Sequence, residues 1–322
     1  MLIDIFFLLL GFGLIIVGAN GLTDGSSAIA KRWGVSDLVI GLTVVSFGTS
    51  APELVISLMS AIKGSSELAV GNVVGSNIFN VLAIIGVVAM VKPIVIEKTV
   101  LTIEIPLVVL SAAVLLDMGN GPLLDGAPER MVTRVDGIIL LLFFCIFMVR
   151  TFSHAKNPQP GVDATPPGVK PMALWKAVVW TVGGLAGLVY GGDCFVRGAS
   201  GIASGLGVSD AVIGLTVVAA GTSLPELATS VTAAVKGQSG IAIGNVIGSN
   251  IFNIFFVLGA TATIRPLAFG SIGNFDLIYM FGACVLFWVV GWFFKDRTIT
   301  RWEGALMGAC YVAYIAALIA KL

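Results

Sequence analysis

Residues Gly34–Ile94 read GVSDLVIGLTVVSFGTSAPELVISLMSAIKGSSELAVGNVVGSNIFNVLAIIGVVAMVKPI, and the chain repeats this stretch once. The second copy, at Gly207–Leu267, reads GVSDAVIGLTVVAAGTSLPELATSVTAAVKGQSGIAIGNVIGSNIFNIFFVLGATATIRPL. About 35 of the 61 positions are identical at a constant offset of 173 residues. A long internal duplication predicts a protein built from two homologous halves, and in a membrane protein it is typical of transporters.

The composition is that of a membrane protein. Of the 322 residues, 57% are hydrophobic and 11% are charged, whereas soluble domains carry about a quarter of charged residues. The apolar runs are long enough to cross about 30 Å of hydrocarbon as helices, and they lack the strict alternation of a transmembrane barrel. We therefore expect a bundle of transmembrane helices embedded in a lipid bilayer.

The apolar runs predict an all-α integral membrane protein with ten transmembrane helices, arranged as two inverted five-helix repeats with broken helices at the centre. The repeats occupy residues 1–151 and 173–322, and a proline-rich cytoplasmic linker, residues 152–172, joins them. Because each repeat has an odd number of spans, the second must enter the membrane from the opposite side. The predicted spans are Leu2–Gly25, Leu38–Ile62, Leu68–Met90, Val100–Leu116, Val135–Thr151, Ala173–Val196, Ala211–Val235, Ile241–Ala262, Phe275–Phe294 and Glu303–Ala320.

The loop charges predict the orientation. With ten spans, 12 of the 18 Lys and Arg residues fall after odd-numbered spans and 6 fall on the other side. By the positive-inside rule both termini lie outside, in an inner or plasma membrane. Glycines cluster in the first and sixth spans, and we expect them to form smooth surfaces that slide past the core of the bundle.

Several function classes find no support in the residues. Cys145, Cys194, Cys284 and Cys310 sit singly in apolar segments, and His154 is the only histidine. Neither a Cys/His metal centre nor a His-based catalytic pair can be assembled from them. An intramembrane aspartyl protease would need two facing Asp residues within a matching motif. We expect no enzyme activity, no resident cofactor, no nucleic acid and no obligatory protein partner.

Two carboxylates in the middle of predicted spans carry the chemistry. Glu53 follows Gly48-Thr49-Ser50-Ala51-Pro52, and Glu226 follows Gly221-Thr222-Ser223-Leu224-Pro225. A charge at this depth costs several kcal/mol and marks a functional site by default. Proline removes a backbone donor, so each span should break just before its Glu. Broken helices at matching places in two halves predict a site at the membrane midplane.

The next predicted span of each half carries a polar stripe. Its members repeat every fourth residue and so share one helix face: Asn72, Ser76, Asn80, and in the second half Asn245, Ser249, Asn253. By the same spacing Asn77 and Asn250 point elsewhere. Gly71 with Gly75, and Gly244 with Gly248, should let these helices approach their neighbours closely.

The candidate site therefore offers only oxygen. Carboxylates, hydroxyl groups, amide oxygens and freed carbonyls suit Ca²⁺, which takes about six to eight oxygen ligands, better than they suit Zn²⁺ or Cu²⁺. An empty site with two ionised glutamates would carry two negative charges, and such a site is costly to enclose in a bilayer. One Ca²⁺ or two monovalent cations would neutralise it. Reorientation only when loaded would then couple the two ions.

At GTSAPE with GNVVGSNIFN, and at GTSLPE with GNVIGSNIFN, the chain resembles the cation/calcium exchanger superfamily, above all its prokaryotic sodium/calcium exchanger branch. The resemblance implies ten spans in inverted halves, with Glu53 and Glu226 as the central calcium carboxylates. Oxygens of Thr49, Ser50, Thr222 and Ser223 would surround them. Ser76, Asn80, Ser249 and Asn253 would complete the calcium and sodium positions. Some members carry Asp where this chain has Asn253, so the resemblance fixes neither the sodium stoichiometry nor a potassium requirement here.

We expect a secondary-active antiporter that exports Ca²⁺ in exchange for Na⁺ by alternating access around Glu53 and Glu226. A calcium/proton antiporter is the nearest alternative, because two protons neutralise two glutamates as well as sodium does. A passive cation channel would also use carboxylates and broken helices.

Overall fold

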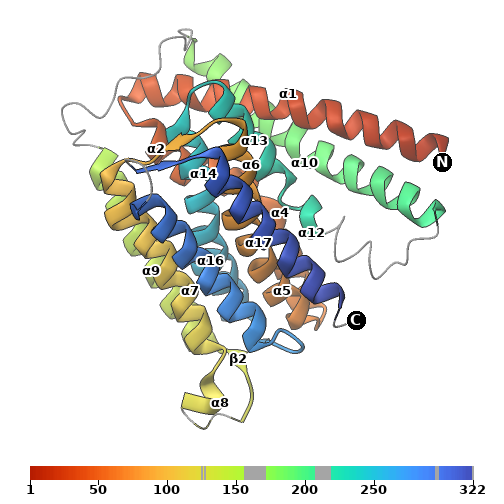
Figure 1. The fold of residues 1–322 in the computed structure, drawn as a ribbon, viewed down its shortest axis with the longest axis vertical. Coiled ribbons are helices and arrows are strands. Elements are labelled where there is room, and N and C mark those ends of the chain that lie inside the picture. Colours follow the sequence, from red (N-terminus) through yellow and green to blue (C-terminus); the bar gives the residue numbers. More distant parts are fainter. Residues whose placement is uncertain (125, 127, 156–171, 207–218, 294–296, 321–322) are drawn as a thin grey trace.

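The computed structural model describes residues 1–124, 126, 128–155, 172–206, 219–293 and 297–320. These residues form helices almost throughout, joined by loops and four very short strands (Figure 1). The elements, in chain order and with π-helices written η, are α1 Leu2–Trp33, α2 Asp37–Ile40, η1 Gly41–Val45, α3 Ser46–Thr49, α4 Ala51–Ile62, α5 Ser66–Ile78, η2 Phe79–Ile84, α6 Ile85–Val91, β1 Ile94–Val95, η3 Val100–Glu104, α7 Ile105–Met118, α8 Gly121–Leu124, β2 Met131–Val132, α9 Arg134–Ala155, α10 Leu174–Gly205, α12 Ala219–Gly221, α13 Leu224–Val235, α14 Ser239–Ile251, η5 Phe252–Leu258, α15 Gly259–Ile264, β3 Leu267–Ala268, α16 Asn274–Phe293, β4 Thr298–Ile299 and α17 Arg301–Ile319.

The all-helical membrane fold is confirmed. Eight helices of the described residues are long and apolar enough to cross a membrane, and a ninth span results if Asp37–Thr49 and Ala51–Ile62 count as one bent helix. Of the predicted span Ala211–Val235, only α12 and α13 fall within the described residues. The total of ten spans therefore stays a prediction. Most of the predicted linker, residues 156–171, also lies outside the described residues, and α9 continues to Ala155.

The helices α1 and α10 are longer than their apolar runs predict. Each has 32 residues and so spans about 48 Å, which exceeds the roughly 30 Å of a bilayer core. They pack side by side in opposite directions, and Figure 1 shows the pair inclined to the other helices. Small residues such as Ser26 and Ser27 extend α1 beyond the predicted end because they are buried inside the protein.

Glycines at seven-residue intervals determine how closely α1 and α10 approach. A Cβ atom on Gly18 would lie 2.7 Å from the carbonyl oxygen of Gly184, and one on Gly11 would lie 2.6 Å from that of Gly191. Backbones in such contact gain van der Waals packing, which drives helix association in membranes. The expectation that these glycines form sliding surfaces against the core is wrong for Gly11, Gly18, Gly184 and Gly191, because they join the two helices to each other.

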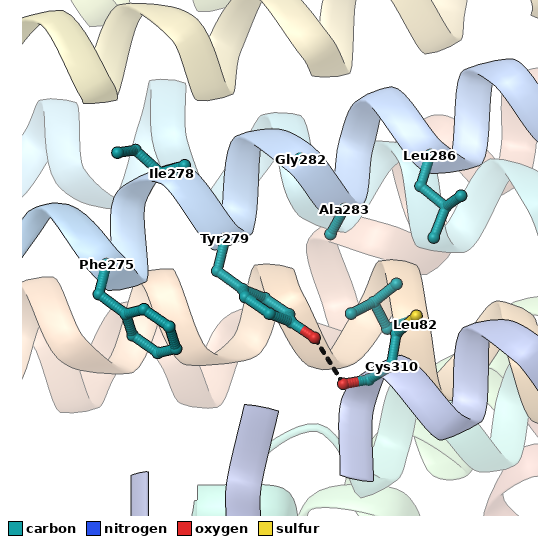
Figure 2. A pocket seen from close by; sticks show the side chains of 8 residues that line it. All are labelled: Leu82, Phe275, Ile278, Tyr279, Gly282, Ala283, Leu286 and Cys310. Carbon is teal, nitrogen blue, oxygen red and sulfur yellow. Dashed lines mark hydrogen bonds between the residues drawn. The ribbon is translucent and has the colours of Figure 1, made fainter. Parts of the chain in front are cut away.

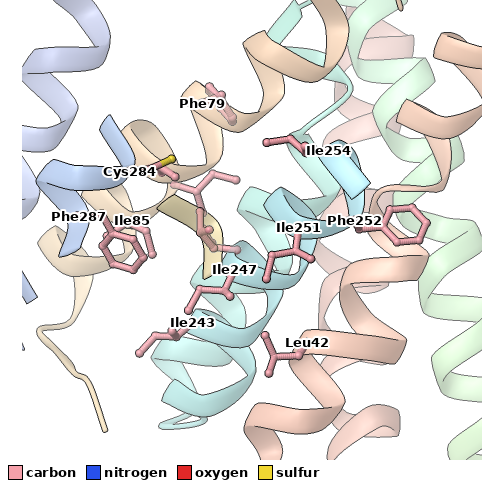
Figure 3. Close-up of a cluster of buried hydrophobic side chains, with 14 of the residues drawn as sticks. Leu42, Phe79, Ile85, Ile243, Ile247, Ile251, Phe252, Ile254, Cys284 and Phe287 are labelled. Carbon is pink, nitrogen blue, oxygen red and sulfur yellow. The ribbon is translucent and has the colours of Figure 1, made fainter. Parts of the chain in front are cut away.

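The helices with the polar stripes lie at the centre of the molecule. In the most apolar window of Ser239–Ile264, 94% of the residues are buried, and in that of Ser66–Val91, 78% are. The corresponding shares are 22% for α1 and 17% for α17. Figure 3 shows part of the packing that buries α14, where Ile243, Ile247 and Ile251 lie among side chains of the surrounding helices.

The predicted close approach at Gly244 and Gly248 is confirmed. A Cβ atom on Gly244 would lie 2.7 Å from the carbonyl oxygen of Leu38, so α14 packs directly on the backbone of the α2–α3 segment. A Cβ atom on Gly75 would meet no described atom of another element within 4 Å, and one on Gly71 would meet only the side chain of Ile272. The residues that repeat Leu38 and most of its segment, 211–218, lie outside the described residues, so the prediction for the first half is untested.

Two short antiparallel ladders join the halves of the chain. Strand β1 pairs with β4, with Ile94 opposite Ile299, and β2 pairs with β3, with Val132 opposite Leu267. Each ladder takes one strand from each half. The ladders satisfy backbone groups in the connections between helices, where the helical pattern ends.

A Cβ at the α1–α10 contact should destabilise the protein. Glycine to alanine inside a helix ordinarily stabilises by roughly 0.5–1 kcal/mol, but Gly18→Ala forces a methyl group against the Gly184 carbonyl and should cost about 1–3 kcal/mol. We expect a lower melting midpoint in detergent. Gly13→Ala and Gly183→Ala are matched controls on the same helices, because a Cβ there meets no atom within 4 Å. Equal midpoints for Gly18→Ala and the controls would show that the contact is not tight.

Candidate cation site

Each Pro-Glu motif breaks its helix as predicted. Helix α3 ends at Thr49, α4 begins at Ala51, and their axes differ by 45°. Ser50 at the break has φ −86° and ψ 6°, and Ser223 in the second half has φ −95° and ψ 9°. Proline fits the first turn of a helix, where its missing N–H breaks no hydrogen bond, but it cannot continue one. The two halves thus repeat the same local structure.

The breaks place both glutamates at the start of a helix and inside the protein. Glu53 lies in the first turn of α4 and Glu226 in the first turn of α13, and each has an exposed fraction of 0%. Carboxylates are stabilised at a helix N-terminus, where backbone N–H groups carry a partial positive charge. The predicted burial of these two side chains in the core of the fold is confirmed.

Serines connect the two glutamates across the halves. The hydroxyl of Ser50 donates to Oε1 of Glu226 at 2.9 Å, and that of Ser223 donates to Oε1 of Glu53 at 3.2 Å. Each carboxylate therefore accepts a hydrogen bond from the residue at the helix break of the other half. The two carboxylates are thus connected by hydrogen bonds that cross between the halves.

Asparagines fix the glutamate helices onto the central helices. The Asn72 amide donates to the backbone oxygen of Glu53 at 3.3 Å and to the Ser57 hydroxyl at 3.1 Å. In the second half, the Asn245 amide donates to the backbone oxygen of Glu226 at 3.2 Å and to the hydroxyl of Ser230 at 3.0 Å. These amide groups bind the backbone at the helix breaks. They therefore leave the side-chain oxygens of the glutamates available to other partners.

The structure places most of the other predicted site residues around the carboxylates. The Ser76 hydroxyl donates to Glu53 Oε1 at 3.4 Å, and the hydroxyl oxygens of Ser76 and Ser223 lie 3.2 Å apart. The side chains of Thr49 and Ser249 are both fully buried, and among the described residues the Ser249 hydroxyl has no hydrogen-bond partner. Thr49 donates to Asn245 Oδ1 at 3.1 Å. Its counterpart Thr222 is only half-buried.

Asn80 and Asn253 lie in the first turns of the π-helices η2 and η5, and both are fully buried. Single π-turns within α-helices are frequent at functional sites. Among the buried oxygens, Oε2 of each glutamate and Oδ1 of each of these asparagines accept no hydrogen bond. Buried polar atoms are rarely left without a partner, so these four oxygens are candidate cation ligands. Other buried side-chain oxygens of the described residues, such as Ser26 Oγ and Thr261 Oγ1, also lack a partner.

Within the described part of the chain, no Lys or Arg forms a salt bridge with Glu53 or Glu226. The charged pairs lie elsewhere: Asp24 with Lys236 at 2.7 Å, Asp193 with Arg197 at 3.0 Å, and Glu104 with Arg150 at 3.2 Å. Among the described residues, no three His, Cys, Asp or Glu side chains lie close enough together to hold a metal ion. A cation at the glutamates would need neutral oxygens as its further ligands.

Sequence reasoning missed four of these contacts. The serine–glutamate bonds between the halves depend on how the halves pack, and no spacing within one half reveals them. Glu104 lies inside the predicted span Val100–Leu116. An acidic residue in a span indicates a positively charged partner, which for Glu104 is Arg150. The spacing predicts that Asn77 lies off the stripe of its own helix, and it does not reveal that Asn253 of the other half donates to Asn77 Oδ1 at 3.3 Å. Asn250 does point elsewhere and donates to the Val246 carbonyl of its own helix.

An open groove on the side of the bundle is apolar and does not fit a cation. It has a volume of about 360 Å³. Figure 2 shows that Tyr279, its most polar side chain, donates its hydroxyl to the Cys310 carbonyl. The lining residues are Leu82, Phe275, Ile278, Tyr279, Gly282, Ala283, Leu286 and Cys310.

Comparisons with known proteins agree on one family. A family model described as sodium/calcium exchanger protein matches residues 3–153 and 176–320. The sodium/calcium exchanger MaX1 of Methanosarcina acetivorans is 32% identical, and the alignment covers 98% of each chain. The inner membrane protein YrbG of Escherichia coli is 33% identical over 99% of this chain and 97% of its own. A solved structure of the sodium-calcium exchanger NCX_Mj, soaked with Na⁺ and Ca²⁺, superimposes with a TM-score of 0.82 at 31% identity and covers 98% of both chains.

Removing one buried charge should stabilise the protein when no cation is present. Glu53→Gln keeps the oxygen that accepts from Ser223 and removes a charge without a basic partner. In cation-poor buffer at alkaline pH we expect a higher melting midpoint, and roughly 1 kcal/mol corresponds to about 1–2 °C in a protein of this size. Glu104→Gln is the control with opposite sign, because it breaks the pair with Arg150. A lower melting midpoint for Glu53→Gln would contradict the view that the Glu53 carboxylate lacks a compensating positive charge.

Proposed function

The chain belongs to the sodium/calcium exchanger family, and on that premise we propose that it exports Ca²⁺ in exchange for Na⁺ by alternating access around Glu53 and Glu226. The observation that carries the proposal is the pair of fully buried carboxylates, each hydrogen-bonded to a serine of the other half. Glu53, Glu226, Thr49, Ser50, Thr222, Ser223, Ser76, Asn80, Ser249 and Asn253 form the proposed ion site.

Charge compensation supplies the coupling. With both glutamates ionised, the site carries two negative charges in a region of low dielectric constant, where an uncompensated charge is costly. One Ca²⁺ or two Na⁺ ions neutralise it, so the protein reorients readily only in the loaded state. The ion that leaves on one side must then be replaced before the site returns, which couples the two fluxes without ATP.

We also propose ten spans in two inverted repeats. In support, the contacts of one half have reciprocal counterparts in the other. Asn72 with Glu53 repeats as Asn245 with Glu226 at the same offset of 173 residues, and the strand pairs β1–β4 and β2–β3 each join one half to the other. Five spans per half would invert the second repeat and place both Glu-bearing breaks near the same depth.

The proposed location is the cell membrane, with both termini outside. The excess of Lys and Arg in one set of loops supports this orientation. The related YrbG is named an inner membrane protein, which agrees with a plasma or inner membrane. From there, calcium export would remove the ion from the cytoplasm.

Sodium is the coupling ion that the donor set favours. The hydroxyl groups of Ser50, Ser76 and Ser223 surround carboxylates that two protons alone would neutralise. A proton needs a single oxygen, whereas a sodium ion needs several neutral oxygens at once. The excess of hydroxyl and amide oxygens therefore favours Na⁺ over H⁺. A potassium requirement stays open.

The coupling ion can be tested in inside-out vesicles, whose lumen corresponds to the cell exterior. Vesicles are loaded with Na⁺ or with choline and diluted into Na⁺-free medium that contains radioactive Ca²⁺, with pH and membrane potential clamped by ionophores. We expect Ca²⁺ accumulation only in the Na⁺-loaded vesicles. Uptake that follows an imposed pH gradient and ignores Na⁺ would establish the calcium/proton exchange instead, and passive equilibration without a counter-ion would indicate a channel.

Each glutamate should be essential in the same assay. Glu53→Gln and Glu226→Gln leave a site with one negative charge, too few to offset Ca²⁺, and losing the charged ligand should lower Ca²⁺ transport by at least about a hundredfold, or about 2.7 kcal/mol. Glu129→Gln is the control, because Glu129 is exposed in a loop. Size-exclusion chromatography checks that the variants fold. Retained transport in either variant would remove that glutamate from the site.

A further inference from the structure

Two asparagines from opposite halves meet beside the proposed ion site. Asn253 of η5 donates its amide to Oδ1 of Asn77 in α5 at 3.3 Å, and the exposed fractions are 0% for Asn253 and 1% for Asn77. Asn77 directly follows Ser76 in α5, and the Ser76 hydroxyl donates to Oε1 of Glu53 at 3.4 Å. The contact therefore borders the carboxylates, although Asn77 is outside the proposed ligand set.

An asparagine can favour or oppose a cation. Its Oδ1 is an acceptor with two lone pairs, while its NH₂ group is a double donor that carries partial positive charge. If the NH₂ group turned toward the ions, it would repel them. For Asn253 to serve as a ligand, its NH₂ group must be engaged by an acceptor on the other side.

We infer that Asn77 is a positioning residue: its Oδ1 engages the NH₂ group of Asn253 and so turns the Asn253 oxygen toward the transported cations. Oδ1 of Asn253 is buried and accepts no hydrogen bond, as expected for an oxygen reserved for an ion. This role rests on the proposed function. It adds to that function a residue that holds one ligand in its binding orientation before the ion arrives, which reduces the ordering cost of binding.

The repeat does not provide the same device twice. Asn250, the counterpart of Asn77, donates to the carbonyl of Val246 on its own helix at 2.8 Å. Asn80, the counterpart of Asn253, is fully buried, and neither of its amide atoms forms a hydrogen bond with the described part of the chain. The inference therefore applies to one half only, and it predicts that Asn253 is pre-oriented while Asn80 is not.

An aspartate at position 253 would make this positioning unnecessary. A carboxylate has two acceptor oxygens and no donor, so both of its orientations present oxygen to a cation. The effect of removing the Asn77 oxygen should thus depend on whether position 253 carries an amide or a carboxylate. A residue that merely fills space would matter equally in both cases.

The test is a double-mutant cycle with Asn77→Ala, Asn253→Asp and both together, and Asn250→Ala is the matched control from the other half. The readout is the Ca²⁺ concentration that half-saturates binding to the purified protein in Na⁺-free buffer, obtained by fitting the logarithmic rise of the melting midpoint with Ca²⁺. We expect Asn77→Ala to raise this concentration about three- to tenfold, the effect of one hydrogen bond, and Asn250→Ala to leave it unchanged. In the Asn253→Asp background, Asn77→Ala should have no effect.

An equal loss from Asn77→Ala in both backgrounds, or no loss in the parent chain, would overturn the positioning role. If Asn253→Asp does not fold, Asn77→Asp replaces it, because it keeps an acceptor for the Asn253 amide. It should bind Ca²⁺ at least as tightly as the parent, and a loss equal to that of Asn77→Ala would overturn the inference. A parent chain that Ca²⁺ does not stabilise would instead refute the proposed function, and this role with it.

Discussion

Two buried carboxylates without a basic partner impose the main constraint on this structure. Glu53 and Glu226 are fully buried, and no salt bridge to either exists among the described residues. In a protein that spans a bilayer, such charges are tolerated only when something compensates them. Serine hydroxyls, helix N-termini and neutral amides supply partial compensation. A mobile cation is the remaining source of full positive charge, and the family to which the chain belongs exchanges such cations.

The rest of the fold positions this pair. The proline breaks start new helices at the glutamates, and Asn72 and Asn245 hold those helices against the central α5 and α14. Those central helices are the most deeply buried of the described spans. The glycine-mediated pair α1–α10 lies outside them, joined along its length by direct backbone contact. The site thus sits on elements that mirror each other, and each half contributes a hydroxyl to the carboxylate of the other.

Much of this could be predicted from the sequence because the deciding physics is local. Proline cannot donate a backbone hydrogen bond, so the motif itself predicts the breaks before Glu53 and Glu226. The four-residue spacing places Ser76 on the helix face that reaches the Glu53 carboxylate. Contacts between the halves could not be predicted, because Ser50 with Glu226 and Asn77 with Asn253 arise from packing between distant segments. Helical spacing placed Asn77 off the stripe, yet a residue beside the stripe can still meet a side chain from the other half. The lengths of α1 and α10 were underestimated because buried Ser and Gly residues continue a helix past its apolar run.

The central claim is that a cation occupies the space between the two glutamates. Anomalous diffraction from crystals soaked in Sr²⁺, a divalent ion of calcium-like chemistry, tests it most directly. The account predicts one strong anomalous peak within coordination distance of both carboxylates, which weakens as Na⁺ is added. Crystals that bind strontium only at surface sites, with nothing between Glu53 and Glu226, would contradict it.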